Sequence, residues 1–205
     1  MALVLWSGGC DSTMALLALL KDSPMERIRT LSIRHPQFGA AREKLKARDE
    51  LQKAMRGYYG YEFDRIELTI DHKGGEIQGL AGGQQPVTWL TLGSLYAHPT
   101  ENVHAGYIRG DSFWMASHTQ QEAFRQHQEV QGKTGQLVLP GESWTRADVL
   151  LQLKAWRLLD LCWWCESPAK ARGRKTTQCG RCDPCLNHGA GQWILDQKAK
   201  QENRT

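Results

Sequence analysis

The 205-residue sequence lacks any apolar run that approaches the roughly 20 residues of a membrane-spanning helix. It also lacks a basic leader ahead of the apolar residues 2–6, so we expect no secretory signal. These two absences predict a cytoplasmic protein that does not enter a membrane. In a reducing compartment, its six cysteines should then be thiols or metal ligands rather than disulfides.

The sequence has no internal repeat and no strong charge of one sign. Its net charge is +4, with 40% hydrophobic and 23% charged residues, an ordinary balance for one globular α/β domain with a small appendage. This mild positive charge suits an anionic substrate such as ATP, and it does not by itself indicate nucleic acid. Nucleic-acid binding through the basic segment 170–175 stays open, although such runs are usually solvated surface.

The most informative segment is 7–12, which reads Ser-Gly-Gly-Cys-Asp-Ser between an apolar strand and an apolar helix. Gly8 and Gly9 let the backbone turn sharply and approach a phosphate closely. The first N–H groups of the following helix have no intrahelical partner, and the helix dipole favours an anion there. Ser7 and Ser12 add hydroxyl groups, and Asp11 is a plausible ligand for a phosphate-bound Mg²⁺.

This loop lacks the Lys-Ser/Thr ending of the GxxxxGK[ST] phosphate loop. A kinase or GTPase that depends on such a lysine is therefore disfavoured. The segment is instead similar to the pyrophosphate loop of enzymes that split ATP into AMP and pyrophosphate. An ordinary strand-to-helix turn with small capping residues is the alternative, and the order strand, loop and helix argues against it.

Apolar patterns of strand and helix alternate along the chain. The expected strands are 3–6, 27–33, 63–70, 102–108 and a short one at 137–139. The expected helices are 11–21, 40–56, 88–96, 117–131 and 145–161. Residues 74–85 are rich in Gly and Gln and indicate a loop.

This alternation predicts an α/β fold in which a parallel sheet is flanked by helices on both faces. Ligands bind at the carboxyl ends of the strands in such sheets, and the segment 7–12 leaves the carboxyl end of the first strand. We expect residues 1–144 to form the ATP-binding α/β domain. Residues 145–205 would form a C-terminal helix and a zinc-binding segment packed on it.

The C-terminal region carries the second strong motif, because Cys179, Cys182 and Cys185 form an overlapping C-x-x-C-x-x-C. Two-residue gaps let thiolates converge on one ion, and structural zinc prefers four ligands. Cys162 or Cys165 can supply the fourth thiolate, and we favour Cys165. An iron–sulfur cluster and a redox dithiol remain as alternatives. His188 could replace one thiolate, but we expect it to be an exposed helix residue.

Both ends of the chain resemble one family, the QueC family of 7-cyano-7-deazaguanine synthases. That family pairs an N-terminal SGGxDS loop with a C-terminal segment similar to LTWSCYE followed by CGxCxxC. Residues 161–167 (LCWWCES) and 179–185 (CGRCDPC) match this ending. The match aligns Cys165 with the first zinc cysteine and leaves Cys162 at a position without a ligand role.

The middle of the chain resembles the family less. Residues 32–38 (SIRHPQF) stand where the family has SFDYGQRH, and they keep Ser32 and Gln37. The family's Arg-Asn pair ahead of the next helix is replaced by Gln85-Pro86. Asp111 is kept after the fourth strand, but the family's Tyr-Pro-Asp-Cys-Arg run is not. The nucleotide half and the zinc segment are thus retained, while the acceptor pocket is altered.

The resemblance implies an adenine nucleotide alpha hydrolase-like, Rossmann-like fold and an ATP-dependent carbon–nitrogen ligase. The enzyme would adenylate 7-carboxy-7-deazaguanine or a related carboxylate and release pyrophosphate. Ammonia would then give an amide, and a second adenylation would give the nitrile. The cofactors implied are ATP, Mg²⁺ and Zn²⁺, and the expected assembly is a homodimer.

The residues expected to act fall into three sets. The catalytic set is Asp11, Ser12 and Asp111, and the metal ligands are Cys165, Cys179, Cys182 and Cys185. The nucleotide would be bound by Ser7, Gly8, Gly9, Asp11, Ser12, Ser32 and Gln37. A related ATP pyrophosphatase with another acceptor, such as an amide ligase or a tRNA-modifying enzyme, and a degenerate nucleotide- or deazapurine-binding protein are the alternatives. A tRNA thiolase would need a reactive Cys10.

Overall fold

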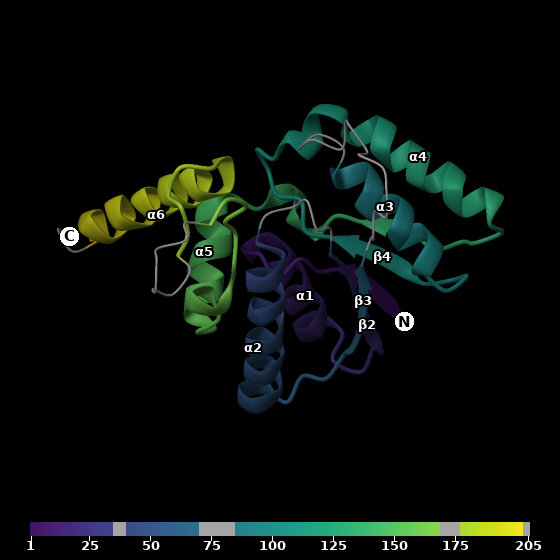
Figure 1. The fold of residues 1–205 in the computed structure, drawn as a ribbon, viewed down its shortest axis with the longest axis horizontal. Helices are drawn as coiled ribbons and strands as arrows, with labels where there is room; N and C mark the ends of the chain where they lie inside the picture. The colour runs from purple at the N-terminus through teal and green to yellow at the C-terminus, as the bar shows by residue number, and fades with distance from the viewer. Residues whose placement is uncertain (35–39, 70–84, 169–176, 203–205) are drawn as a thin grey trace.

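The computed structural model describes residues 1–34, 40–69, 85–168 and 177–202. Its centre is a parallel sheet (Figure 1). The sheet has five strands in the order β3-β2-β1-β4-β5. The strands are β1 (Ala2–Leu5), β2 (Ile28–Arg34), β3 (Asp64–Thr69), β4 (Asn102–Ala105) and β5 (Leu137–Val138). The α/β class and the parallel sheet predicted from the sequence are confirmed.

Helices connect the strands and cover both faces of the sheet. The α-helices are α1 (Cys10–Asp22), α2 (Ala41–Tyr59), α3 (Gln85–Tyr96), α4 (Ser117–Val130), α5 (Arg146–Ala155) and α6 (Asp183–Glu202). Short 3-10 turns are η2 (Ser112–Ala116), η3 (Pro140–Ser143) and η4 (Leu159–Leu161). None of the helices in these described parts of the chain has the length and apolar character needed to cross a bilayer.

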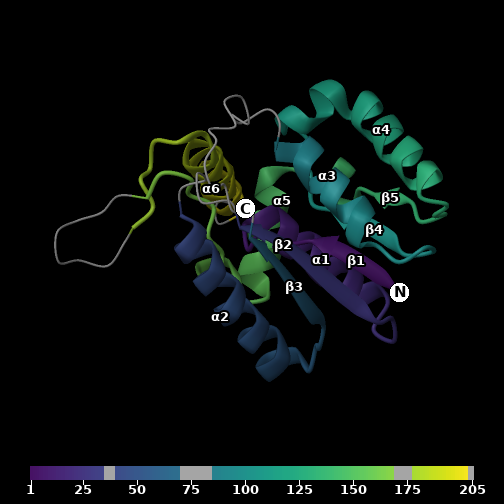
Figure 2. The same cartoon turned by 45° about the vertical axis from the view of Figure 1, so that its right-hand side comes forward.

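The central strand β1 is buried on both faces, which explains its continuous apolar sequence. Val4 and Trp6 face one core, which they share with apolar side chains of α1, α2 and α5. Leu3 and Leu5 face a second core, formed with α3 and α4. Figure 2 shows α3 and α4 on one side of the sheet and α2 and α5 on the other.

The strand order reverses at β1, because β2 and β3 lie on one side of it and β4 and β5 on the other. In a parallel sheet, such a reversal opens a crevice at the carboxyl ends of the two strands whose connections diverge. The loop 7–12 leaves β1 at this point, and the chain leaves β4 there as well. The fold therefore brings the predicted phosphate loop to the one crevice that this strand order creates.

The helix predicted over 145–161 is too long. Helix α5 begins after Thr145, which forms a capping box with Asp148, and it ends at Ala155. Arg157 adopts a left-handed conformation with φ of 53°. The Leu158 N–H then bonds to the Leu153 carbonyl at 2.9 Å and the Arg157 N–H to the Lys154 carbonyl, which is the Schellman arrangement that closes a helix.

The strand predicted over 102–108 is likewise too long, since β4 ends at Ala105. The next residue, Gly106, passes so close to α1 that a Cβ there would lie 2.5 Å from the Asp11 carbonyl oxygen. The chain then turns, and the Ile108 N–H bonds to the Asp111 carboxylate at 2.9 Å. The residues after β4 therefore wrap around the start of α1 and carry Asp111 toward it.

The C-terminal part of the chain continues the core and then extends beyond it. Val149, Leu150 and Leu153 of α5 are buried with side chains of β1 and α1. Helix α6 packs beside α5 and runs away from the sheet to the C-terminal end (Figure 1). The division of the chain at residue 144 remains a prediction.

Candidate functional site

The loop 7–12 is braced by its own hydroxyl groups. The Ser7 and Ser12 Oγ atoms lie 2.9 Å apart, and Ser12 Oγ also accepts from the Ser7 N–H and donates to the Gly9 carbonyl. The Gly9 N–H donates to Ser7 Oγ at 3.2 Å. These bonds hold the two serines in a fixed loop between β1 and α1.

The start of α1 presents donors without helical partners. The first helical bond of α1 runs from the Thr13 N–H to the Gly9 carbonyl at 3.0 Å. The N–H groups of Cys10, Asp11 and Ser12 therefore precede the hydrogen-bonded part of the helix. Gly9 is the N-cap residue, and it carries no side chain that could accept from them. Together with the helix dipole, this arrangement favours an anion.

Gly8 is required by both its conformation and its surroundings. Its φ is +82°, a left-handed value that strains any residue with a side chain. A Cβ at this position would lie 2.8 Å from Arg48 Cγ and 3.2 Å from the Lys44 carbonyl oxygen. Helix α2 thus passes directly behind the loop, and only glycine fits between them.

Arg48 of α2 supports the loop 7–12 through a hydrogen bond to its backbone. Its guanidinium donates to the Ser7 carbonyl at 3.0 Å and to both carboxylate oxygens of Glu67, at 3.0 and 2.7 Å. Its side chain is only 3% exposed. This buried arginine ties the loop to β3 and cannot reach a ligand in the crevice.

A cavity of about 170 Å³ opens beside the loop at the carboxyl ends of β1 and β4. It has polar groups of the loop on one side and aromatic side chains on the other. The lining residues are Leu5, Ser7, Gly9, Asp11, Ser12, Trp89, Ala105, Gly106, Tyr107 and Asp111. The cavity combines a few convergent polar groups with an apolar wall, as small-molecule sites do.

The charged groups of this crevice are two carboxylates and one guanidinium. Arg146, the first residue of α5, donates through Nη1 to Asp11, and its Nη2 lies 3.5 Å from Asp111 Oδ1. All three side chains are between 20% and 24% exposed. One positive charge therefore lies between two negative ones beside the open end of α1.

Burial decides the protonation of these carboxylates. It raises the pKa of Asp11, and the Arg146 guanidinium partly offsets that rise. The pKa of Asp111 is raised from 3.8 to about 6, mainly by burial and secondly by the negative charge of the nearby Asp11 carboxylate. Asp111 can therefore hold or release a proton near neutral pH, whereas an ordinary aspartate cannot.

Ser32, one of the predicted nucleotide-binding residues, does not line the cavity. Ser32 is fully buried in β2, and its hydroxyl donates to the Trp6 carbonyl at 2.6 Å. Gln37 lies outside the described residues. The other five predicted residues, Ser7, Gly8, Gly9, Asp11 and Ser12, form the loop and the first turn of α1.

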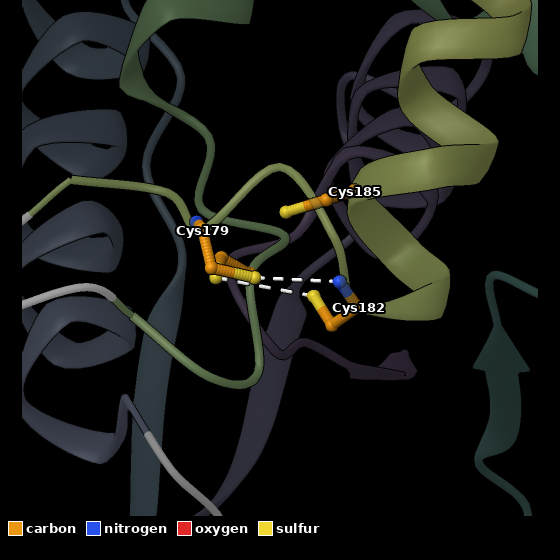
Figure 3. Close-up of side chains that lie close together, drawn as sticks. Cys179, Cys182 and Cys185 are labelled. Atoms are coloured by element: carbon orange, nitrogen blue, oxygen red, sulfur yellow. Dashed lines mark hydrogen bonds between the residues drawn. The ribbon is translucent and has the colours of Figure 1, made fainter.

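Four cysteines meet at a second site, between η4 and α6. The sulfur atoms of Cys165, Cys179, Cys182 and Cys185 all lie within 4.8 Å of one another, so they could hold one zinc ion. Figure 3 shows the side chains of Cys179, Cys182 and Cys185 pointing toward one another. Cys185 comes from the first turn of α6, and Cys179 and Cys182 precede that helix.

Backbone N–H groups point at the sulfurs of this cluster. The Cys179 N–H lies 3.2 Å from Cys165 Sγ, and the Arg181 and Cys182 N–H groups lie 3.5 and 3.3 Å from Cys179 Sγ. The Arg181 N–H is the main cause that lowers the pKa of Cys179 to about 6. Such donors favour the thiolate form, which is the form that binds a metal.

Cys162, the alternative fourth ligand, lies elsewhere. It is 3% exposed, and its thiol donates to the Leu158 carbonyl at 3.5 Å. It is packed in the same core as Cys10, which is 2% exposed, and contact with Cys162 is the main cause that raises the pKa of Cys10. The structure therefore groups Cys165 with the other three cysteines and pairs Cys162 with Cys10.

The loop 7–12 and the cysteine cluster are physically connected. The Trp163 N–H donates to the Gly8 carbonyl at 3.0 Å, and the Trp163 indole donates to the Cys165 carbonyl at 2.8 Å. Trp163 thus bonds to the loop through its backbone and to a cluster residue through its side chain. The two motifs found at opposite ends of the sequence form one continuous region.

His188 departs from the sequence expectation of an exposed helix residue. Its ring stacks on Trp164, with centroids 3.6 Å apart and planes 7° from parallel. Burial is the main cause that lowers its pKa to about 4, so the ring is neutral at pH 7. It lies outside the group of four sulfurs that could hold a metal.

Sequence reasoning missed the basic residues of the region, which are Arg146, Arg48 and Lys44. Lys44 lies near Glu166, Cys165 and Cys182, and burial lowers its pKa. Arg146 is 135 residues from Asp11 in sequence, so no local spacing relates the two. The charged pattern of α2 resembles a solvated helix, although Arg48 is buried. The capping signal at Thr145 could have identified Arg146 as the start of a helix, but not its partners.

Comparison with known proteins adds no identification. The chain matches no protein-family model and no curated protein sequence.

Proposed function

We propose that this chain is an ATP-dependent carbon–nitrogen ligase similar to the QueC family, with an adenine nucleotide alpha hydrolase-like, Rossmann-like fold. The observation that carries the proposal is the SGGCDS loop at the reversal of strand order. There the N–H groups at the start of α1, which have no helical partners, lie beside Arg146 and two partly buried carboxylates. A helix N-terminus that favours an anion, next to an aspartate with a pKa of about 6, suits phosphate chemistry better than a structural turn does.

The loop would bind the pyrophosphate part of ATP. The N–H groups at the start of α1 and the hydroxyls of Ser7 and Ser12 are the nearest donors. Arg146 adds the positive charge, and an arginine can contact two phosphate oxygens at once. Its present partners, Asp11 and Asp111, hold it at the edge of the cavity, where phosphate oxygens would compete for it.

The donor set also fits Mg²⁺, because Asp11 and Asp111 offer carboxylate oxygens beside the phosphate position. Mg²⁺ is commonly held by one or two carboxylates together with substrate phosphates and water. When bound, the ion would neutralise charge on the phosphates. Asp11 would hold it, and Arg146 would shift from the carboxylates to the phosphate oxygens.

The reaction consists of two displacements. A substrate carboxylate oxygen attacks the α-phosphorus, forms a new O–P bond and expels pyrophosphate. Ammonia then attacks the activated acyl carbon, and AMP leaves with the C–O bond electrons. The protein mainly positions the groups and stabilises developing charge. Asp111, with a pKa of about 6, would accept the proton that ammonia loses as the amide forms.

The acceptor is the part of the proposal that the resemblance supports least. We propose 7-carboxy-7-deazaguanine or a related planar carboxylic acid, since Trp89 and Tyr107 line the cavity and Tyr107 stacks on Phe113 with parallel rings. Replacement of the family's Arg-Asn pair by Gln85-Pro86 removes a charged contact. A second adenylation that dehydrates the amide to a nitrile would use the same loop.

The test is product analysis with zinc-loaded protein, MgATP, ammonium and 7-carboxy-7-deazaguanine. The expected products are AMP, pyrophosphate and an amide or nitrile, identified by mass spectrometry. An Asp111→Asn variant should form less product, because it loses the proton acceptor. AMP without an amide or nitrile would indicate another acceptor, and the absence of AMP with any carboxylic acid would remove the ligase class.

A tRNA thiolase is less well supported. That reaction needs an accessible cysteine to carry sulfur beside the ATP site, and Cys10 is 2% exposed and packed with Cys162. A Cys10→Ser variant should therefore keep full activity. A nucleotide-binding protein without turnover would bind ATP in calorimetry and form no AMP.

A further inference from the structure

Helix α6 lies directly against Arg146 at one glycine. A Cβ at Gly191 would lie 2.5 Å from Arg146 Cγ, 3.3 Å from Arg146 Cβ and 3.0 Å from Leu150 Cδ1. The methylene groups of Arg146 therefore pass against the bare backbone of α6, and no larger residue fits there without displacing them. Leu150, one turn further along α5, forms the other wall of this contact.

Glycine at position 191 lowers the stability of helix α6. Glycine in a helix interior is about 1 kcal/mol less favourable than alanine. Two residues earlier on the same helix, Gly189 is exposed and a Cβ there would meet nothing within 4 Å. Space alone therefore gives no reason for glycine at 189, whereas at 191 the Arg146 side chain occupies the position of the missing Cβ.

Two cysteines of the cluster lie at the start of α6. Cys182 immediately precedes the helix and Cys185 lies in its first turn, and both sulfurs belong to the group of four. Gly191 follows Cys185 within about two helical turns, at 3.6 residues per turn. A metal held by the four sulfurs would therefore set the position of the helix surface that touches Arg146.

Holding an arginine side chain in one conformation costs about 2 kcal/mol of rotamer entropy. Packing against a neighbouring backbone restricts the side chain and so helps to place its guanidinium. Its guanidinium lies between Asp11 and Asp111, and it lowers the pKa of both carboxyl groups against the effect of burial. The charged and titratable groups that face Asp111 are Asp11 from α1, Arg146 from α5 and the neighbouring Tyr107.

We infer that α6 is the positioning element of the phosphate site. The four-cysteine centre anchors its first turn, and Gly191 holds the Arg146 side chain in the conformation that reaches Asp11 and Asp111. Gly191 is thus a positioning residue that acts through Arg146. The role of Arg146 as a phosphate contact rests on the proposed function. The packing of Gly191 against Arg146 does not depend on it.

The test uses the full zinc-loaded chain with Gly191→Ala and, as the matched control, Gly189→Ala. The first measurement is the titration of the Asp111 carboxyl carbon by NMR. In G191A the displaced guanidinium should let the pKa of Asp111 rise by about one unit, within the range that a nearby opposite charge produces. G189A should leave the titration unchanged, and both variants should retain one equivalent of zinc. An unchanged Asp111 pKa in zinc-retaining G191A would overturn the inference.

A double variant separates the contact from general damage to the helix. In an Arg146→Ala background the crowding Cγ is absent, so adding Gly191→Ala should leave the pKa of Asp111 where R146A alone puts it. If G191A alone does not fold, recovery of folding in R146A/G191A supports the contact. A double variant that stays unfolded while R146A folds would count against it.

The second measurement is binding of α,β-methylene-ATP with Mg²⁺ by calorimetry. We expect G191A to bind it at least tenfold more weakly than G189A. Absence of binding in every variant, together with the NMR shift in G191A, would reject the proposed function and keep the positioning contact. Equal binding in G191A and G189A would show that Gly191 does not position Arg146 for phosphate.

Discussion

Arg48→Met tests how strongly helix α2 supports the loop 7–12. Methionine fills the space of the arginine methylene groups with an apolar chain of similar length. The main loss is therefore the guanidinium. Three hydrogen bonds disappear, one to the Ser7 carbonyl at 3.0 Å and two to Glu67 at 3.0 and 2.7 Å. The structural question is which of these losses leaves a polar group without a partner.

Glu67 loses least, because its carboxylate is 31% exposed and also accepts from Arg65 at 2.6 Å. The Ser7 carbonyl loses a charged donor in a part-buried place. Breaking a fully buried ion pair costs about 3–5 kcal/mol, and a hydrogen bond to a charged group contributes about 1.5–3 kcal/mol. Because Glu67 stays solvated and paired, we expect R48M to lower the free energy of unfolding by about 2–3 kcal/mol.

The assay is urea unfolding of zinc-saturated protein, with the free energy extrapolated to water. Lys53→Met is the matched control, because Lys53 is a cation of the same helix whose side chain is 75% exposed. K53M should change the free energy by about 0.5 kcal/mol or less. If R48M and K53M gave equal free energies of unfolding, the support assigned to Arg48 would be wrong.

Three further predictions concern pH, metal and backbone. The folded pKa of Asp111, about 6, exceeds its usual 3.8, so the stability from its protonated form is complete below about pH 4 and lost as pH rises through 6. Asp111→Asn should therefore gain stability relative to wild type between pH 4 and 8 in urea unfolding, and a pH-independent difference would contradict this. Cys165→Ser should lose tightly bound zinc by metal analysis, whereas Cys162→Ser should keep it; the reverse result would reassign the fourth ligand. Gly8→Ala should lose about 2 kcal/mol or more by the same urea assay, since a left-handed φ costs about 1–3 kcal/mol and its Cβ would be crowded. Gly110→Ala, with φ of +94° and open space, should lose less, and equal losses would remove the crowding argument.

The sequence was a good guide where structure follows from local pattern. The apolar run before Ser7 and the small residues after it predicted a strand and a helix, and the structure has them at Ala2–Leu5 and Cys10–Asp22. Alternation of such units predicted the parallel sheet because parallel strands need crossovers. The two-residue gaps between the last three cysteines predicted that their sulfurs would meet.

The pattern misled where buried residues continue beyond a helix. Leu158, Leu159 and Leu161 extend the apolar spacing of α5, so a helix to 161 was expected. Leu158 is fully buried and the other two pack on the same core, but from a chain that has already turned at Arg157. Apolar spacing reports burial, and burial does not require the helix to continue.

The charged part of the site could not be predicted, because it depends on contacts between distant segments. Arg146 meets Asp11 only because α5 packs on α1 and the chain after β4 carries Asp111 to the same place. Similarly, the burial of Arg48 follows from the passage of α2 behind Gly8. Neither relation leaves a spacing signal along the chain.

The six cysteines fall into two groups, and their reactivity with a thiol reagent can report on metal binding and on folding. Cys10 and Cys162 are enclosed in the core, whereas the other four are gathered where a metal would mask them. Within the cluster, Cys179 and Cys182 are partly exposed, whereas Cys165 and Cys185 are buried. A thiol reagent should consequently find few reactive groups in the metal-loaded chain, at least Cys179 and Cys182 after chelation, and all six cysteines only after unfolding. Counting reacted thiols would thus distinguish loss of the metal from loss of the fold in a single experiment.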